Sequence, residues 1–121
     1  MGNIIDLDIS NSISMTHFEI LTTEVGSEED LRFTFTLQNV SDRNIRLDIR
    51  YEIVHPEPDG RKVARLYRIS NRKCPTGFLQ YNRHHTINPD IRHPRFVPIP
   101  CELKIVVNGK RLGSAEFEVI P

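Results

Sequence analysis

Two alternating runs of residues on either side of an Asn-Gly pair constrain the fold of this 121-residue chain more than any other feature. Before the Asn108-Gly109 pair, the residues Leu103, Ile105 and Val107 alternate with polar positions. After it, the alternating apolar residues are Leu112, Ala115, Phe117 and Val119. Asn-Gly favours a type I′ turn, because both central residues of that turn need a positive φ. The pattern therefore predicts a C-terminal β-hairpin with a two-residue turn.

The apolar residues of this hairpin change phase within its second strand. A two-residue turn would pair Ile105 with Leu112, so that even-numbered residues of the return strand face the core. Yet Ala115, Phe117 and Val119 are odd-numbered. One extra residue near Gly113-Ser114 resolves the conflict, and we predict a β-bulge there.

Alternation also predicts the other strands. It is clearest over residues 31–38 and 45–53, and less regular over 3–9, 15–21, 62–70 and 78–87. In the run 45–53, the residues expected to face inward are Ile45, Leu47, Ile49, Tyr51 and Ile53. The residues on its other face alternate in sign, which predicts a solvated and self-paired surface of Arg46, Asp48, Arg50 and Glu52.

The segments between these runs contain turn-forming residues. Residues 71–77 are expected to form a loop, and four prolines within 88–100 favour an extended loop or a sheet edge. No segment longer than a turn repeats apolar residues with a helical period. A chain with about seven short strands and this length predicts one domain over residues 1–121, an all-β immunoglobulin-like antiparallel β-sandwich.

Length and apolar content also bear on the protein's location. No apolar run approaches the ~18–20 residues that span a bilayer, and the N-terminus lacks the basic start and apolar stretch of a secretory signal. We therefore expect a cytoplasmic protein with no membrane contact. In that compartment Cys74 and Cys101 are expected to be unreactive thiols, with a disulfide between them as the less favoured alternative.

The net charge of zero hides a division between the two halves of the chain. Residues 1–60 contain twelve acidic and four basic residues, and residues 61–121 contain four and twelve. We favour the interpretation that oppositely charged strands neutralise each other across a sheet. The alternative is an anionic partner such as nucleic acid, because the basic segment 61–95 also contains Tyr67 and Tyr81, with Phe96 just after it. Its candidate contact residues are Arg65, Arg68, Arg72, Lys73, Arg83, Arg92 and Arg95.

The residue patterns required for catalysis or metal binding are weak in this sequence. Asp6 and Asp8 share one face of an expected strand and are interpreted as solvated surface. His84 and His85 are neighbours on a strand and point to opposite faces. His85, His93 and a cysteine match no zinc-ligand spacing, so we predict no enzyme activity, no cofactor and no metal.

Several segments together resemble a known domain. They are Leu47-x-Ile49-x-Tyr51-x-Ile53-Val54-His55, Gly60-Arg61-Lys62-Val63, Ile69-Ser70, Arg83-His84-His85 with Pro89, and Leu103-x-Ile105-x-Val107-Asn108-Gly109-Lys110-x-Leu112 with Ala115-x-Phe117. They resemble the immunoglobulin-like β domain at the C-terminal end of some bacterial DNA alkylation repair proteins, which otherwise consist of HEAT-like helical repeats. The resemblance covers roughly residues 15–119.

This resemblance implies the sandwich fold and an association with DNA repair. The helical repeats have no counterpart here, so no catalytic residue of the family is carried over. The family's aromatic and arginine-rich run before the last hairpin is present only as Arg92-His93-Pro94-Arg95-Phe96. We therefore predict a non-catalytic interaction or accessory module with a protein partner. The alternative function is direct nucleic-acid binding through residues 61–95.

Overall fold

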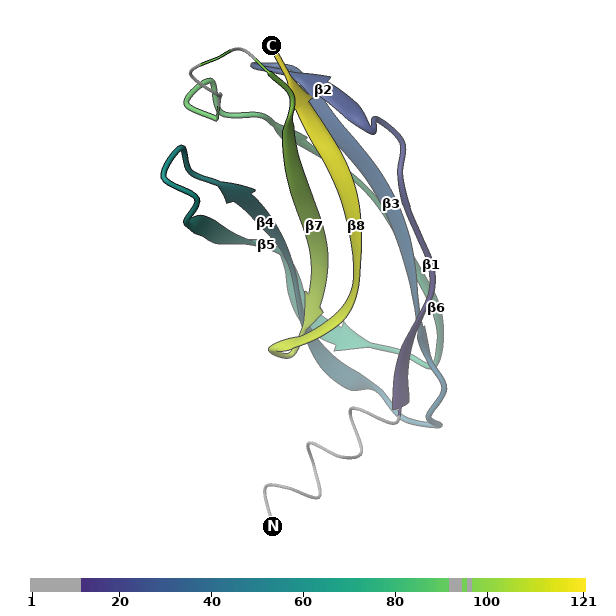
Figure 1. Ribbon diagram of the computed structural model, residues 1–121. Coiled ribbons are helices and arrows are strands. Elements are labelled where there is room, and N and C mark those ends of the chain that lie inside the picture. The colour runs from purple at the N-terminus through teal and green to yellow at the C-terminus, as the bar shows by residue number, and fades with distance from the viewer. Residues whose placement is uncertain (1–11, 92–94, 96) are drawn as a thin grey trace.

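The computed structural model describes residues 12–91, Arg95 and residues 97–121, and it is built of β-strands (Figure 1). The strands of the described residues are β1 (Ile13–Ile20), β2 (Glu24–Gly26), β3 (Asp30–Asn39), β4 (Ile45–Pro56), β5 (Lys62–Cys74), β6 (Gly77–Thr86), β7 (Ile99–Val107) and β8 (Lys110–Ile120). Residues 3–9, where a first strand was predicted, lie outside the described residues, as do Asp6 and Asp8. Among the described residues, no helix has the length and apolar character needed to cross a bilayer.

The strands form two sheets that pack face to face (Figure 1). One sheet has the order β1-β3-β6 and the other β2-β8-β7-β4-β5. Only the short β2 pairs in parallel, with β8, and the remaining described pairings are antiparallel. The predicted immunoglobulin-like β-sandwich is confirmed.

The core lies between the two sheets and follows the predicted alternation. Along β3 the inward residues Leu31, Phe33, Phe35 and Leu37 are at most 1% exposed. The five inward residues predicted for β4 are also buried. Both cysteines are buried free thiols, Cys74 at the end of β5 and Cys101 in β7. Burial raises the pKa of both thiols, that of Cys101 to about 12, which keeps them protonated and unreactive.

Three β-bulges interrupt the regular pairing of the described strands. In β1 the register shifts between Met15 and His17, leaving Thr16 as the extra residue. In β5 the extra residue is Ile69, because Ile49 pairs with Ser70 and Arg50 with Arg68. The bulge in β1 explains the irregular pattern of residues 15–21, whereas the pattern of residues 62–70 is irregular because the apolar Leu66 lies on the outer face, where it is 50% exposed.

The third bulge is the one predicted for the C-terminal hairpin. Ile105 pairs with Gly113 and Val106 with Arg111, so the extra residue is Leu112, directly before the predicted Gly113-Ser114. The turn itself is as predicted, with φ of 50° at Asn108 and 82° at Gly109.

Two other expectations need correction. Residues 71–74 continue β5 instead of forming a loop, because they pair with β4 from Ile45 to Asp48. Glu52, expected on a solvated surface, is only 5% exposed. The Arg111 guanidinium covers it, with Nε donating to Glu52 Oε1 at 3.1 Å, since Arg111 pairs with Val106 on the same outward face of the sheet.

Rings and a histidine close the side of the core next to β5 and β6. Tyr51 lies 5.1 Å from Tyr67 and 5.6 Å from His85, measured between ring centroids. The Tyr51 hydroxyl is 2.8 Å from Nδ1 of His85. Burial lowers the pKa of His85, although Asp30 opposes the shift and His84 adds to it. His85 is therefore neutral at pH 7 and packs, half-buried, against the rings of Tyr51 and Tyr67 at the border of the core.

The hairpin turn offers a direct test of the fold. The Asn108 side chain accepts a hydrogen bond from the Asp48 N–H at 2.8 Å and donates one to the Arg46 carbonyl at 3.3 Å. We expect Gly109→Ala to lower the free energy of unfolding by about 1–2 kcal/mol, the cost of a left-handed backbone for an L-residue. Asn108→Gly keeps the backbone conformation and should cost about 0.5–1.5 kcal/mol for each lost bond. Urea unfolding followed by circular dichroism measures both, and a fully stable Asn108→Gly variant would contradict the link to β4.

His85 should make the stability depend on pH. Its pKa is lower in the folded than in the unfolded chain, so the unfolded state takes up the proton first. The stability that neutral His85 contributes is present above the ordinary histidine pKa of about 6.5 and is lost as the pH falls below it. We expect the melting temperature of the wild type to fall more between about pH 7.5 and about pH 5.5 than that of His85→Gln. His17→Gln, altered at an exposed position of β1 that does not contribute to the His85 shift, serves as the control and should behave as the wild type.

Candidate nucleic-acid interface at the β5–β6 edge

The last strand of each sheet lies on the same side of the sandwich, and we call this side the β5–β6 edge. β5 ends the five-stranded sheet and β6 ends the three-stranded sheet, and residues 75–76 connect them. Inward side chains of the two strands meet there. Ser70 Oγ lies 3.3 Å from the Tyr81 hydroxyl, and the Tyr67 and His85 ring centroids are 4.6 Å apart.

The bulge at Ile69 determines which cations of β5 face this edge. Arg65 pairs with the inward residue Ile53, and Arg72 pairs with the inward residue Leu47. Both arginines are exposed because β5 is the last strand of its sheet. Side chains alternate along a strand, so Arg65 and Arg72 emerge on the side of β5 that faces β6.

Arg83 reaches the same edge from β6. It pairs with the inward residue Phe33, yet its side chain is exposed. Its guanidinium carbon lies 5.5 Å from the centroid of the Tyr81 ring. Arg65, Arg72 and Arg83 therefore line one edge, although they are separated by up to eighteen residues in the sequence.

The other candidate residues lie elsewhere. Arg68 and Lys73 are exposed on the outer face of the five-stranded sheet, where they pair with Arg50 and Arg46. Arg95 is exposed between β6 and β7. Arg92 lies outside the described residues, together with His93 and Phe96.

One ion pair of the basic segment, Arg68 with Asp48, joins neighbouring strands as the favoured interpretation of the charge pattern predicts, and another lies within the turn between β4 and β5. Asp48 lies 3.1 Å from Arg50 and 3.7 Å from Arg68, and Asp59 lies 2.7 Å from Arg61. The hydrogen bond from Arg50, aided by the charges of Arg50 and Arg68, holds the pKa of Asp48 below its usual value.

Most of the candidate cations take no part in such pairs. Within the described part of the chain, Arg65, Arg72, Lys73 and Arg83 have no carboxylate within ion-pair distance. Their positive charge is therefore available to an anionic ligand.

The aromatic residues expected to interleave with these cations are already packed. The Tyr81 ring is buried, with its centroid 5.1 Å from that of Phe35. The Tyr67 ring packs against the rings of Tyr51 and His85. Their ring faces serve the core and the Arg83 contact, so they do not form an open stacking surface.

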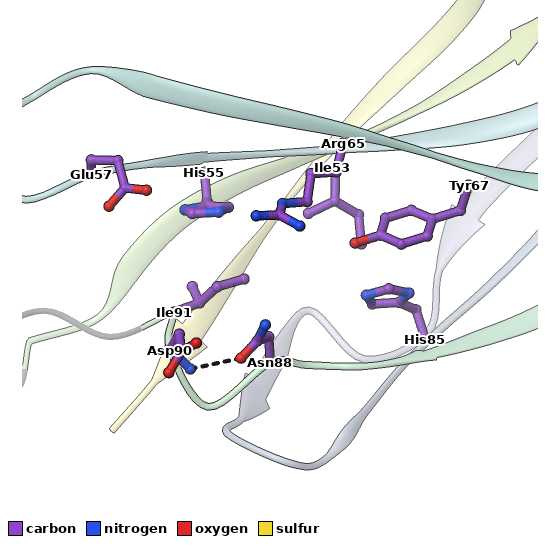
Figure 2. Close-up of a pocket in the computed structure, with 9 residues that line it drawn as sticks. All are labelled: Ile53, His55, Glu57, Arg65, Tyr67, His85, Asn88, Asp90 and Ile91. Carbon is purple, nitrogen blue, oxygen red and sulfur yellow. Dashed lines mark hydrogen bonds between the residues drawn. The ribbon is translucent and has the colours of Figure 1, made fainter.

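A cavity of about 260 Å³ lies at one end of the β5–β6 edge (Figure 2). Its polar and charged lining includes His55, Glu57, Arg65, Tyr67, Asn88 and Asp90. Two isoleucines, Ile53 and Ile91, and the ring of His85 complete it. Figure 2 shows the side chains from β4, β5 and the turn between them on one side, and His85, Asn88, Asp90 and Ile91 on the other.

Backbone hydrogen bonds hold the loop that forms one wall of this cavity. The Ile87 N–H donates to the Glu29 carbonyl at 2.9 Å, and the Ile91 N–H donates to the Asn88 carbonyl at 3.0 Å. The Asp90 N–H donates to Asn88 Oδ1 at 2.9 Å. The cavity wall is thus built from turn residues that are fixed to the sandwich.

The sequence did not point to this cavity. His55, Glu57, Asn88 and Asp90 lie next to prolines at two strand ends, which predicts turns and no more. Only the sheet order brings the end of β4 beside the loop after β6. The described residues contain no group of His, Cys, Asp and Glu side chains arranged to hold a metal ion.

Comparisons with known proteins fit this architecture. The chain is similar over 91% of its length to Pseudomonas fluorescens alkylpurine DNA glycosylase AlkC bound to DNA containing an abasic site analog, with 23% identity and a TM-score of 0.79. It is similar over 90% of its length to a Listeria innocua β-glucosidase in complex with gluconolactone, with 16% identity and a TM-score of 0.70. The chain spans 31% of the first protein and 16% of the second, and at these identities the likeness shows the fold alone. A search of curated proteins finds no match.

The sequence profile of one family covers most of the chain. It is described as "Uncharacterised protein YhaZ, C-terminal Ig-like domain" and matches residues 14–121. The match agrees with the resemblance noted in the sequence. The chain therefore belongs to the family of YhaZ C-terminal immunoglobulin-like domains.

Proposed function

We propose that this domain is a non-catalytic accessory module associated with DNA repair, and that its β5–β6 edge contacts the phosphate backbone of DNA. The observation that carries the proposal is the set of exposed cations on this edge without a described carboxylate partner: Arg65, Arg72 and Arg83. Phosphate contacts from arginine and lysine provide most of the sequence-independent affinity of DNA-binding proteins. The geometry of the edge supports this role, because cations from two sheets converge on one side.

The similarity to AlkC adds support from outside the chain. That protein was determined bound to DNA containing an abasic site analog. This chain matches about a third of it, so contact with DNA is carried over here only as part of the proposal.

The accessory role is supported by the state of the reactive groups. Both thiols are buried with raised pKa values, and the His85 ring is engaged by the Tyr51 hydroxyl. Neither arrangement suits a nucleophile or a general base, which must reach a substrate.

The salt dependence of DNA binding tests this proposal. We expect a fluorescently labelled duplex to bind the domain with log K falling by about 0.9 per phosphate contact for each unit of log salt. The double variant Arg72→Ala with Arg83→Ala should lose about two phosphate contacts, and its slope should be smaller by the contribution of those contacts. Fluorescence anisotropy at several salt concentrations measures both.

A matched control separates specific contacts from overall charge. Lys104→Ala with Lys110→Ala removes the same charge from β7 and β8, away from the edge, and should leave the slope nearly unchanged. Failure of the wild type to bind even in dilute buffer would reject DNA contact. An equal loss in both double variants would reject the β5–β6 edge as the contact surface.

A second candidate function, docking to a protein, is favoured by the outer face of the three-stranded sheet. The outward residues of β3 and β6 in this region are uncharged, and Phe78 beside them is 68% exposed. They are Thr34, Thr36, Gln38, Gln80 and Asn82, and they are bordered on β1 by His17 and Glu19. Interface centres are depleted of charge and often contain an aromatic anchor. The occupant that we propose is a helical-repeat chain of a DNA repair protein.

Phe78 allows the two functions to be separated. We expect Phe78→Glu to weaken binding of a purified helical-repeat repair protein, measured by calorimetry, because a charge would be desolvated in the contact. Gln80→Glu, one row along the same strand, tests whether the whole face is used. Unchanged binding in both variants would reject this face, and the salt slope for DNA should not change in either.

A further inference from the structure

We propose that the cavity at the end of the β5–β6 edge receives one unpaired nucleobase of a DNA strand that lies along this edge. This inference rests on the proposed DNA contact and names the part of the nucleic acid that the cavity would take.

The size of the cavity suits a fragment as large as a single base. At about 260 Å³ it far exceeds the share of liquid volume of one water molecule, about 30 Å³. It is smaller than the pockets of about 300–1,000 Å³ that enclose drug-sized ligands. A flat heterocycle fits between these limits.

The lining offers both donors and acceptors. Arg65 and Tyr67 project into the cavity from β5, Asn88 faces them from the loop after β6, and Asp90 lines the cavity beside Ile91 (Figure 2). The Asn88 amide oxygen is used by the Asp90 N–H, which leaves its amide NH2 group free to donate. The Tyr67 hydroxyl has no hydrogen-bond partner among the described residues.

This mixture of charges selects against simple ions. The carboxylates of Glu57 and Asp90 would repel a phosphate group, and the Arg65 guanidinium would repel a cation. The edge of a nucleobase carries donors and acceptors side by side without a net charge, which matches such a lining. The apolar side chains of Ile53 and Ile91 can contact the ring.

Arg65 connects the cavity to the proposed path of the DNA. It lines the cavity and is also the last of the three arginines on the β5–β6 edge, after Arg72 and Arg83. A strand whose phosphates contact Arg72 and Arg83 would therefore reach the cavity at Arg65. An unpaired base at that point can rotate into the cavity without breaking a base pair.

The carboxylates favour bases with an exocyclic amino group. Adenine, cytosine and guanine can donate from such a group to Asp90 or Glu57, whereas thymine has none. The cavity should therefore prefer the first three bases over thymine.

Single-stranded oligonucleotides test this preference. The probes are oligothymidylates that differ only at the central position, which is adenine, cytosine, thymine or an abasic analog. We expect anisotropy to show several-fold tighter binding for central adenine or cytosine than for thymine or the abasic analog. Asp90→Ala should remove the difference.

The control distinguishes a base contact from a change in charge. Asp59→Ala removes the same charge at the neighbouring β4–β5 turn, where Asp59 lies outside the cavity lining. If Asp90 acts only by repelling phosphate, both variants will bind every probe more tightly. If it accepts from the base, only Asp90→Ala will weaken binding of the adenine and cytosine probes.

The possible failures can be told apart. Salt-dependent binding with equal affinity for all central bases would overturn the base site and leave the phosphate contact standing. No binding of any probe in dilute buffer would overturn both. Deoxyadenosine monophosphate that shifts the NMR signals of residues 55–57 and 88–91, without any preference among the oligonucleotides, would show a free-nucleotide site and overturn this proposal.

Discussion

The burial of one face of β3 between the sheets is the constraint on which the rest of this structure depends. Two of its side chains contact the rings that pack near the β5–β6 edge. Phe33 meets the ring of Tyr51 at 5.1 Å, and Phe35 meets that of Tyr81 at 5.1 Å. Tyr51 in turn holds His85, and Tyr81 lies beneath the Arg83 guanidinium. The guanidinium of Arg83 thus rests on a ring that the core holds in place.

The bulge in β5 then determines which side chains lie on the β5–β6 edge. Without the extra residue at Ile69, the even-numbered Arg68 would share a face with Arg72, and Arg65 and Tyr67 would turn outward. One inserted residue therefore brings Arg65 and Tyr67 to the side of β6. It also leaves Arg68 beside Asp48, where its charge is compensated.

Much of the fold could be predicted because regular alternation reports directly on burial. The inward residues of β3 and β4 and the Asn108-Gly109 turn were all identified in this way. Prediction from the sequence is limited at the bulges, because the local pattern shows that a strand contains an extra residue but not which residue it is. The C-terminal bulge was expected at Gly113-Ser114 and occurs at Leu112, and the exposure of Glu52 was wrong because the covering Arg111 comes from a different strand.

The candidate interface was only partly predictable for the same reason. Composition identified the basic residues, but their division between the edge and the outer face depends on the bulge at Ile69. The cavity was missed altogether, since His55 and Asp90 are neighbours only through the order of the sheets. Long-range pairing of this kind leaves no periodic signal in one sequence.

The row of arginines on β5 also has a consequence for the molecule on its own. β5 is thirteen residues long and ends its sheet, so the backbone N–H and C=O groups along its free side could template a strand of another copy. Mutual repulsion between the guanidinium groups of two copies opposes such pairing. A polyanion that neutralises these groups would remove this protection against strand-to-strand self-assembly.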